Sequence, residues 1–209
     1  PKPSSAASDV YKRQVYDFLY PNPESVLAFI ENHDTDRFLG EGNDLPMLKQ
    51  ASTLLLTTRR IPQLYYGTEI MMNGIKSKSD GYVRKDFPGG WADDKETALT
   101  AAGRSKVQND CYNFYKTILN WRKGNDVIAK GSMTQFMVQN GVYAYARQYE
   151  GKTVFVMLNG TNAATSVPLK FYKEILKDAK QGKDILSGRT IAFGEELKME
   201  PRESLVIEL

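Results

Sequence analysis

Between residues 26 and 124, apolar runs alternate with helical patterns, and this order constrains the fold more than any other feature. Residues 26–30 (VLAFI) form a continuous apolar run that is typical of a strand buried on both faces of a parallel sheet. The pattern then predicts a helix from Pro46 to about Arg60, with cations in its last turn, and a second strand over residues 61–66. Strands and helices in this order imply right-handed crossovers and parallel strands.

A long loop and a helix follow. Residues 71–104 exceed the usual length of a connection in a compact domain, and such loops are commonly functional or disordered. The next helix carries apolar residues spaced 4, 3, 4 and 3 along one face: Val107, Cys111, Phe114, Ile118 and Trp121. We therefore interpret Cys111 as a buried core thiol.

The pattern changes beyond Gly124. Short strands over residues 142–146, 153–159 and 204–209, separated by turn dipeptides such as Asn140-Gly141, indicate a small antiparallel β-sandwich. Residues 170–180 predict one or two helical turns between them.

Three parts are expected along the chain. Residues 1–14 are small, polar and then basic, and we interpret them as a disordered or foreign leader. Residues 15–124 form the α/β part, and residues 125–209 form an all-β domain.

Composition excludes several classes of protein. Lys and Arg number 28 against 25 Asp and Glu, and the two signs are interspersed, which argues against a nucleic-acid groove. One cysteine and one histidine are too few for a disulfide scaffold or a usual zinc or iron site. No apolar run approaches the roughly 20 residues of a membrane span, and the N-terminal residues lack the apolar stretch of a signal peptide.

The first predicted strand leads directly into Asn32-His33-Asp34. In parallel α/β folds the carboxyl ends of strands carry catalytic and binding groups, which makes this His-Asp pair a candidate. Taken alone, the segment is explained better by a helix N-cap, in which Asn32, Asp34, Thr35 or Asp36 accepts a backbone N–H.

Three ordered motifs shift that balance. Residues 29–38 (FIENHDTDRF) resemble the motif that ends the seventh barrel strand of the alpha-amylase family, glycoside hydrolase family 13, and residues 60–69 (RIPQLYYGTE) resemble the eighth-strand segment. Residues 80–91 (DGYVRKDFPGGW) are similar to the following loop in the neopullulanase and cyclomaltodextrinase branch. The resemblance covers about residues 15–209. It implies the last two βα units of a (β/α)8 TIM barrel, followed by the small antiparallel β-sandwich.

The resemblance also implies roles for polar residues. Asp34 matches the third catalytic carboxylate, which does not attack but binds sugar hydroxyls and supports distortion toward an oxocarbenium-like transition state. The implied substrate-binding residues are His33, Asn32, Arg37, Asp80 and Arg84. His33 would donate to hydroxyls at the cleavage subsite, and Asp80 with Arg84 would hold the sugar on the non-reducing side of the cut.

Alternatives accompany these roles. Asp80 and Arg84 could form an ordinary surface salt bridge, and Arg37 could orient Asp34, line the site or stand in solvent. Tyr82, Phe87 and Trp91 could stack on sugar rings or pack the loop against the barrel.

The two other carboxylates of a retaining glycosidase are not recognisable in the sequence. In the family, the nucleophile and the acid/base stand at the fourth and fifth strands, and retaining cleavage needs them roughly 5 Å apart. A barrel alone takes about 250 residues, against 209 here. We therefore expect a C-terminal fragment, inactive alone, of an enzyme that cleaves α-1,4 bonds in maltodextrin, pullulan, cyclodextrin or starch oligosaccharides.

Other classes and properties stay open. The chain could instead be a non-catalytic glucan-binding or structural module, or derive from a relative that lost catalysis. No cofactor is expected, and the sequence leaves open a calcium requirement and a homodimeric state of the full-length parent. It also leaves open transglycosylation, α-1,6 preference, and a periplasmic or cytoplasmic location.

Overall fold

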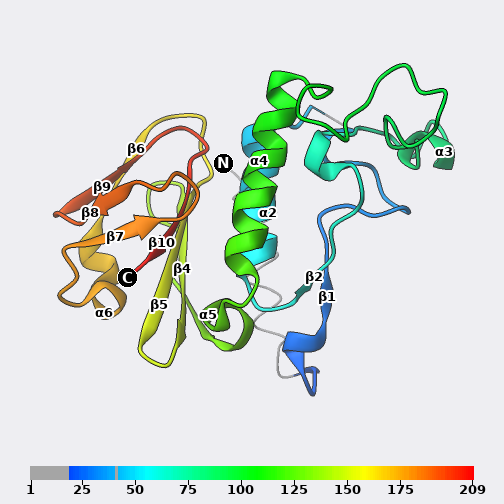
Figure 1. Ribbon diagram of the computed structural model, residues 1–209. Coiled ribbons are helices and arrows are strands. Elements are labelled where there is room, and N and C mark those ends of the chain that lie inside the picture. Colours follow the sequence, from blue (N-terminus) through cyan, green and yellow to red (C-terminus); the bar gives the residue numbers. More distant parts are fainter. Residues whose placement is uncertain (1–18, 41) are drawn as a thin grey trace.

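The computed structural model describes residues 19–40 and 42–209, so the expected leader at residues 1–14 lies outside the described residues. A part built of helices and loops stands beside an antiparallel β domain (Figure 1). The first part contains the elements η2 (Pro23–Ser25), β1 (Leu27–Ala28), η3 (Phe38–Gly40), α2 (Leu45–Thr57), β2 (Ile61–Pro62), η4 (Thr68–Ile70), α3 (Asp80–Val83), α4 (Lys106–Arg122) and α5 (Asp126–Lys130).

The strands β1 and β2 pair in parallel, as the order of the elements predicts. They are shorter than expected, because the last bond between them runs from the Gln63 N–H to the Ala28 carbonyl before the chain turns away. The expectation that residues 26–30 are buried on both faces is wrong. Ala28 is buried, but Leu27 and Phe29 are 52% and 39% exposed, since the helices cover only one face of this pair.

Helix α2 begins as predicted, because the Asp44 carboxylate accepts the Met47 N–H at 2.9 Å and Pro46 occupies the first turn. It ends earlier than predicted. Thr58 has an extended conformation, and its hydroxyl bonds back to the Leu54 carbonyl, so Arg59 and Arg60 lie beyond the last turn.

Helix α4 confirms the predicted helix and begins with a capping box between Ser105 and Gln108. Cys111 is fully buried, as predicted, together with Tyr115 and Ile118. Val107 is 46% exposed, so the predicted apolar face is not buried in the first turn of α4.

The β domain confirms the predicted antiparallel architecture. Its six-stranded sheet has the order β3-β4-β5-β10-β7-β8, and β6 pairs with β9 in a separate antiparallel two-stranded sheet. The strands are β3 (Ser132–Gln135), β4 (Val142–Tyr149), β5 (Lys152–Asn159), β6 (Thr165–Pro168), β7 (Gln181–Asp184), β8 (Thr190–Ala192), β9 (Glu196–Met199) and β10 (Ser204–Glu208). The expected helical turns are η5 (Leu169–Tyr172) and α6 (Lys173–Leu176).

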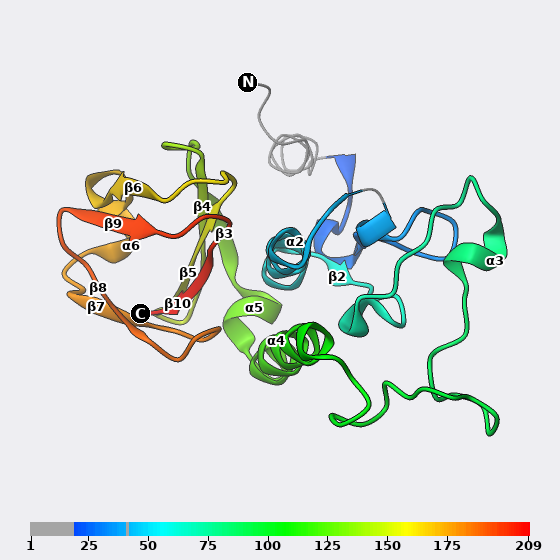
Figure 2. The same ribbon diagram turned by 90° about the horizontal axis from the view of Figure 1, so that it is seen from above.

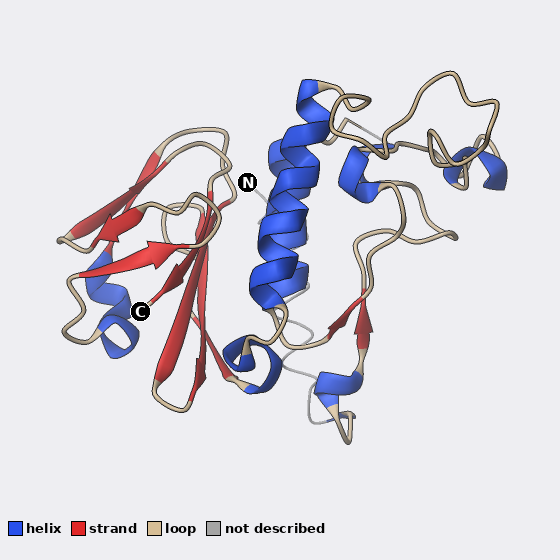
Figure 3. Cartoon of the chain, in the orientation of Figure 1, coloured by secondary structure: helices blue, strands red, loops and turns tan. Residues whose placement is uncertain are grey.

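Both faces of the central strands are buried. In β4, Tyr143 and Tyr145 point toward the helices, whereas Ala144 and Ala146 point into the core of the β domain itself. Helices α2, α4 and α5 lie between this sheet and the β1–β2 pair, both in the view from above (Figure 2) and in the orientation of Figure 1 (Figure 3). One sheet therefore serves two cores.

A buried arginine, Arg147, connects the helices to the sheet through hydrogen bonds. The Arg147 guanidinium donates to the carbonyls of Thr57 (2.9 Å), Gly131 (2.7 Å) and Ser132 (3.3 Å). Thr57 ends α2 and Gly131 caps α5, so the cation lies at the negative ends of two helix dipoles. Burial lowers the pKa of Arg147 to about 10.

Candidate active site

The turn that follows β1 is built on a buried ion pair. The Glu31 carboxylate accepts from Arg37 Nη1 at 3.2 Å, from the Phe38 N–H at 2.5 Å and from the Thr68 hydroxyl. The side chains of Glu31 and Arg37 are only 2% and 0% exposed. The Glu31–Arg37 ion pair therefore connects the two ends of the turn over residues 31–37.

Arg37 belongs to this buried ion pair and lies apart from the exposed residues of the turn. Its guanidinium donates to the carbonyls of Val83 and Tyr66 at 3.0 and 2.6 Å and lies over the Tyr65 ring, 3.9 Å from its centroid. The expectation of a substrate contact, and the alternative of a solvated arginine, are therefore both corrected. Four partners around one planar cation leave it no accessible surface.

Asn32 shapes the turn itself. Its side-chain oxygen accepts the Asp34 N–H at 2.8 Å, and its own N–H donates to the Thr35 hydroxyl at 3.0 Å. These bonds close a turn and no helix begins there, so the helix N-cap explanation of this segment is wrong. His33 and Asp34 are thereby presented at the surface, with side chains 59% and 56% exposed.

Five side chains gather at this surface, and we call them the Asp34 cluster: His33, Asp34, Lys76, Asp80 and Arg84. The Asp34 carboxylate lies 3.0 Å from His33 Nε2 and 3.2 Å from Arg84 Nη2. Asp80 lies 3.3 Å from the same Arg84 nitrogen. Four predicted site residues, separated by as much as 51 positions, thus meet in one place.

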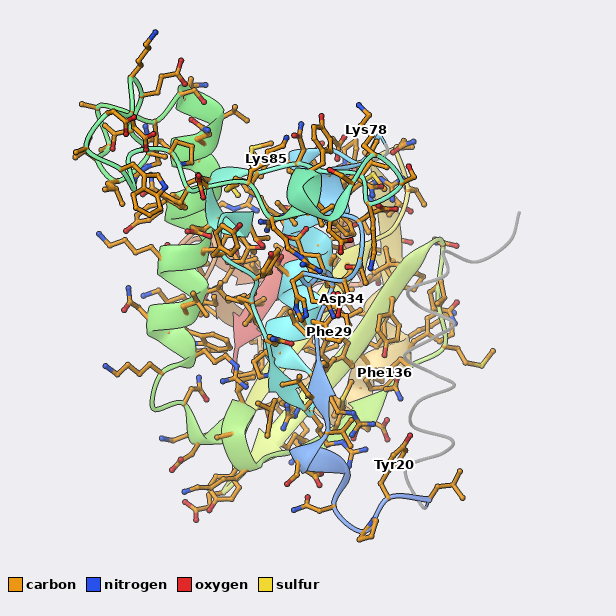
Figure 4. The ribbon with its side chains drawn as sticks, turned by 90° about the vertical axis from the view of Figure 1, so that its right-hand side faces the viewer. Tyr20, Phe29, Asp34, Lys78, Lys85 and Phe136 are labelled. Carbon is orange, nitrogen blue, oxygen red and sulfur yellow. The ribbon has the colours of Figure 1, made fainter. Side chains whose placement is uncertain are left out.

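The short helix α3 brings two of these residues together. Asp80 begins the helix and Arg84 caps its end, so one turn places the two side chains next to each other. Arg84 also donates through Nε to the His33 carbonyl at 3.1 Å, which ties the helix to the turn after β1. Figure 4 shows Asp34 above Phe29 on this face, with Lys78 and Lys85 beyond it.

Lys76 was missed by the sequence analysis. Its Nζ donates to the Asp34 carbonyl at 2.8 Å and lies 3.9 Å from the carboxylates of both Asp34 and Asp80. Its backbone N–H donates to the Asp36 carboxylate. The spacing of four from Asp80 was the available signal, but Lys76 lies in a turn before α3, and the sequence pattern of the loop did not predict that turn.

The charges of the Asp34 cluster balance. Two carboxylates face one lysine and one arginine, and all of them are roughly half exposed. Such a site offers several acceptors and donors without a net charge, which suits a neutral polyol better than an ion.

The aromatic residues of this loop differ in exposure. The nitrogens of Lys85 and Lys78 lie 3.8 and 4.7 Å from the centroid of the Tyr82 ring, and Phe87 is half-buried. Trp91 is 64% exposed, and its backbone N–H donates to Asp94. Exposure leaves Trp91 free to stack on a ligand.

Among the described residues, no group of three or more His, Cys, Asp and Glu side chains is arranged to hold a metal ion. Within the same residues, no helix has the length and apolar character needed to span a membrane.

Comparisons with known proteins identify relatives of the chain. A family profile described as "Cyclo-malto-dextrinase C-terminal domain" matches residues 133–208. An alpha-amylase from Niallia circulans is 30% identical over 195 residues, which cover 88% of this chain and 31% of the relative. A cyclomaltodextrin glucanotransferase from Thermoanaerobacterium thermosulfurigenes is 31% identical over 189 residues, covering 87% and 22%.

The same relationship holds for the fold. The crystal structure of alpha-amylase from Geobacillus thermoleovorans, complexed with acarbose, superposes with a TM-score of 0.74 at 24% identity, over 95% of this chain and 42% of that one. The chain spans no more than about a third of the length of the curated relatives named above. The chain therefore belongs to the alpha-amylase family, glycoside hydrolase family 13, and corresponds to the C-terminal region of its members.

Proposed function

We propose that this chain forms the C-terminal part of an enzyme that cleaves α-1,4 bonds in α-glucans with retention of configuration, of the neopullulanase or cyclomaltodextrinase type. In this proposal residues 15–124 are the closing part of a (β/α)8 barrel, with β1 and β2 as its last two strands, and residues 125–209 are the C-terminal β domain. The parallel β1–β2 pair and the polar cluster after β1 support it.

One observation carries the proposal. Asp34 and His33, from the turn after β1, meet Asp80 and Arg84, from α3, with side-chain distances of 3.0 to 3.3 Å. Surface charge pairs are common, but a carboxylate shared by a histidine and an arginine from two family motifs is not explained by solvation alone.

The geometry supports a separate role for each of these residues. The Asp34 carboxylate would bind sugar hydroxyls and stabilise the positive charge that develops on the ring, and His33 would donate to a neighbouring hydroxyl. Asp80 and Arg84 would hold the next sugar. Arg37, buried below, would act as a positioning residue that keeps the turn in place.

An activity assay tests the central residue. In a whole enzyme containing this chain, Asp34→Asn should lower kcat by about 10²–10³-fold, because the amide cannot stabilise a cationic ring. Asp178→Asn, the same change on the exposed surface of the β domain, serves as the matched control and should leave kcat unchanged.

The chain by itself gives a second measurement. We expect no release of glucose or maltose from maltodextrin by the purified 209 residues, since retaining cleavage needs a nucleophile and an acid/base that we do not recognise in them. Sustained release of either sugar would contradict the assignment, and so would full turnover by the Asp34→Asn enzyme.

A further inference from the structure

A groove lies where the helix layer ends before the six-stranded sheet does. It has a volume of about 570 Å³ and lies beside the C-terminal end of α4, whereas the Asp34 cluster lies on the other side of the helix layer, near α3 (Figures 1 and 2). One wall is formed by Trp121 and residues 123–127, and the other by Tyr149, Lys152 and Glu208 of the sheet. The volume falls within the roughly 300–1,000 Å³ typical of small-ligand sites.

The wall of the groove that the sheet provides lies at the end of the sheet. Tyr149 pairs with Lys152 across the β4–β5 hairpin, and Glu208 of β10 pairs with Val154 of β5. These side chains are on the same face as Tyr145 and Val156, which farther along the strands are covered by α2 and α5. Beyond the ends of α4 and α5, that face is open.

Two aromatic rings line this groove, and one of them is fixed. Trp121 Nε1 donates to Glu208 Oε1 at 2.7 Å, which sets the orientation of the indole. Tyr149 lies opposite, with Lys130 Nζ 5.6 Å from its ring centroid. Lys130 also forms an ion pair with Asp126 at 3.1 Å, so the lysine beside the Tyr149 ring is itself held by α5.

The polar groups around these rings carry both signs of charge. Lys123 and Lys152 offer ammonium donors, and Asp126, Glu150 and Glu208 offer carboxylate acceptors. Aromatic rings beside such donors and acceptors fit a ligand that has apolar ring faces and many hydroxyls. An anionic ligand would meet the carboxylates, and a purely apolar ligand would offer no polar partner to the five charged side chains.

We propose that this groove binds an α-glucan oligosaccharide at a site separate from the Asp34 cluster. Trp121 and Tyr149 provide stacking faces for sugar rings, and Glu208, Lys123 and Lys152 bond their hydroxyls. The choice of the α linkage rests on the proposed function, whereas the choice of a sugar rests on the groove itself. Binding there holds a long substrate on the β-domain side of the molecule.

The two tryptophans of the chain permit a test that resolves the sites. Trp91→Phe leaves Trp121, in the groove, as the one remaining indole. Maltotriose added to this variant should change the Trp121 fluorescence in a saturable way. Adding Tyr149→Ala should weaken the apparent affinity by about tenfold through loss of a stacking face, while circular dichroism reports an unchanged fold.

Matched controls separate this site from the proposed active site. Phe171→Ala removes an exposed aromatic ring elsewhere on the β domain and should leave the titration unchanged. Asp34→Asn should also leave it unchanged. Cellotriose, which has the same composition with β linkages, should produce a weaker response.

Several results would overturn the proposal: no saturable response of Trp121 to maltotriose, an equal response to cellotriose, or a Tyr149→Ala variant that binds as before. Loss of the response on Asp34→Asn would assign the signal to the Asp34 cluster and reject the groove. If maltotriose does not bind in the groove but kcat of the whole enzyme still depends on Asp34, the groove proposal is wrong and the proposed function is unaffected.

Discussion

Arg37 and Arg84 both pair with carboxylates, but they differ in how much of the side chain is exposed to solvent. Arg37 is buried against Glu31, two carbonyls and an aromatic ring, whereas Arg84 is 40% exposed between two carboxylates. Removing one partner of a buried pair leaves the other charge uncompensated, but an exposed pair is largely replaced by water.

We therefore expect Arg37→Met to lower the free energy of unfolding by about 3–5 kcal/mol. The matched change Arg84→Met should cost less than about 1 kcal/mol. Urea unfolding followed by circular dichroism measures both. Equal losses in the two variants would contradict the buried role of Arg37.

Cys111 makes stability depend on alkaline pH. Burial raises the pKa of its thiol from 9.0 to about 12 in the folded chain. Above pH 9 the unfolded chain releases this proton while the folded chain keeps it, so the folded state loses stability as the pH rises.

The expected loss between pH 9 and 10 is about 1 kcal/mol, and the slope approaches about 1.4 kcal/mol per pH unit once the unfolded thiol is fully ionised. Cys111→Ala should flatten that part of the profile, whatever its effect at pH 7. Unfolding curves at pH 8, 9 and 10 for both proteins provide the test, and parallel profiles would rule out the thiol as the cause.

At the scale of elements, the sequence predicted best where packing follows periodicity. Helix α4 and the strands β4, β5 and β10 carry long apolar patterns, and each is present where it was expected. Strands β7 and β9 were missed because both are short, Gln181-Gly-Lys-Asp has no apolar side chain and Glu196-Leu-Lys-Met is half polar, and their pairing is set by distant partners.

The candidate site shows the same limit. Motifs in the sequence pointed to Asp34, His33, Asp80 and Arg84, which the structure brings together. The burial of Arg37 could not be read from its neighbours in sequence, because its partners Tyr66 and Val83 are 29 and 46 residues away. Lys76 was missed for a related reason, since its position depends on the fold of a loop without periodicity.

Arg147 links three elements through one cation. Replacing it with methionine would leave carbonyls at the ends of α2 and α5 without a donor. We expect Arg147→Met to destabilise the chain by about 2–4 kcal/mol. Arg189→Met removes a cation that is 57% exposed in its pair with Glu203, and it should cost less than about 1 kcal/mol in the same denaturation experiment.

Arg147→Lys tests the geometry separately from the charge. A lysine retains the cation but cannot direct a planar fork at three carbonyls, so it should recover only part of the loss. Full recovery by lysine would mean that charge alone is required.

Across the molecule, the β1–β2 pair exposes apolar side chains on the face turned away from the helices. Leu27 and Ile61 are 52% and 50% exposed and lie side by side in register. Apolar faces and unpaired strand edges of this kind promote association.

We expect the purified chain to self-associate as its concentration rises, and Leu27→Lys with Ile61→Lys to suppress this. Light scattering across a dilution series measures the effect. Lysines in place of Leu99 and Met137, which are also exposed but far from this pair in sequence, form the control. Equal suppression by the control pair would argue against the β1–β2 face.

The sheet that serves two cores also affects how this region could be exchanged between enzymes. A joint at residue 124 would separate Tyr143 and Tyr145 from α2 and α4, which pack against their face of the sheet together with α5, and would remove Arg147 from the end of α2. A joint placed before Asp44 would transfer both cores intact. In recombination between relatives, α2, α4 and the β domain should therefore be inherited together.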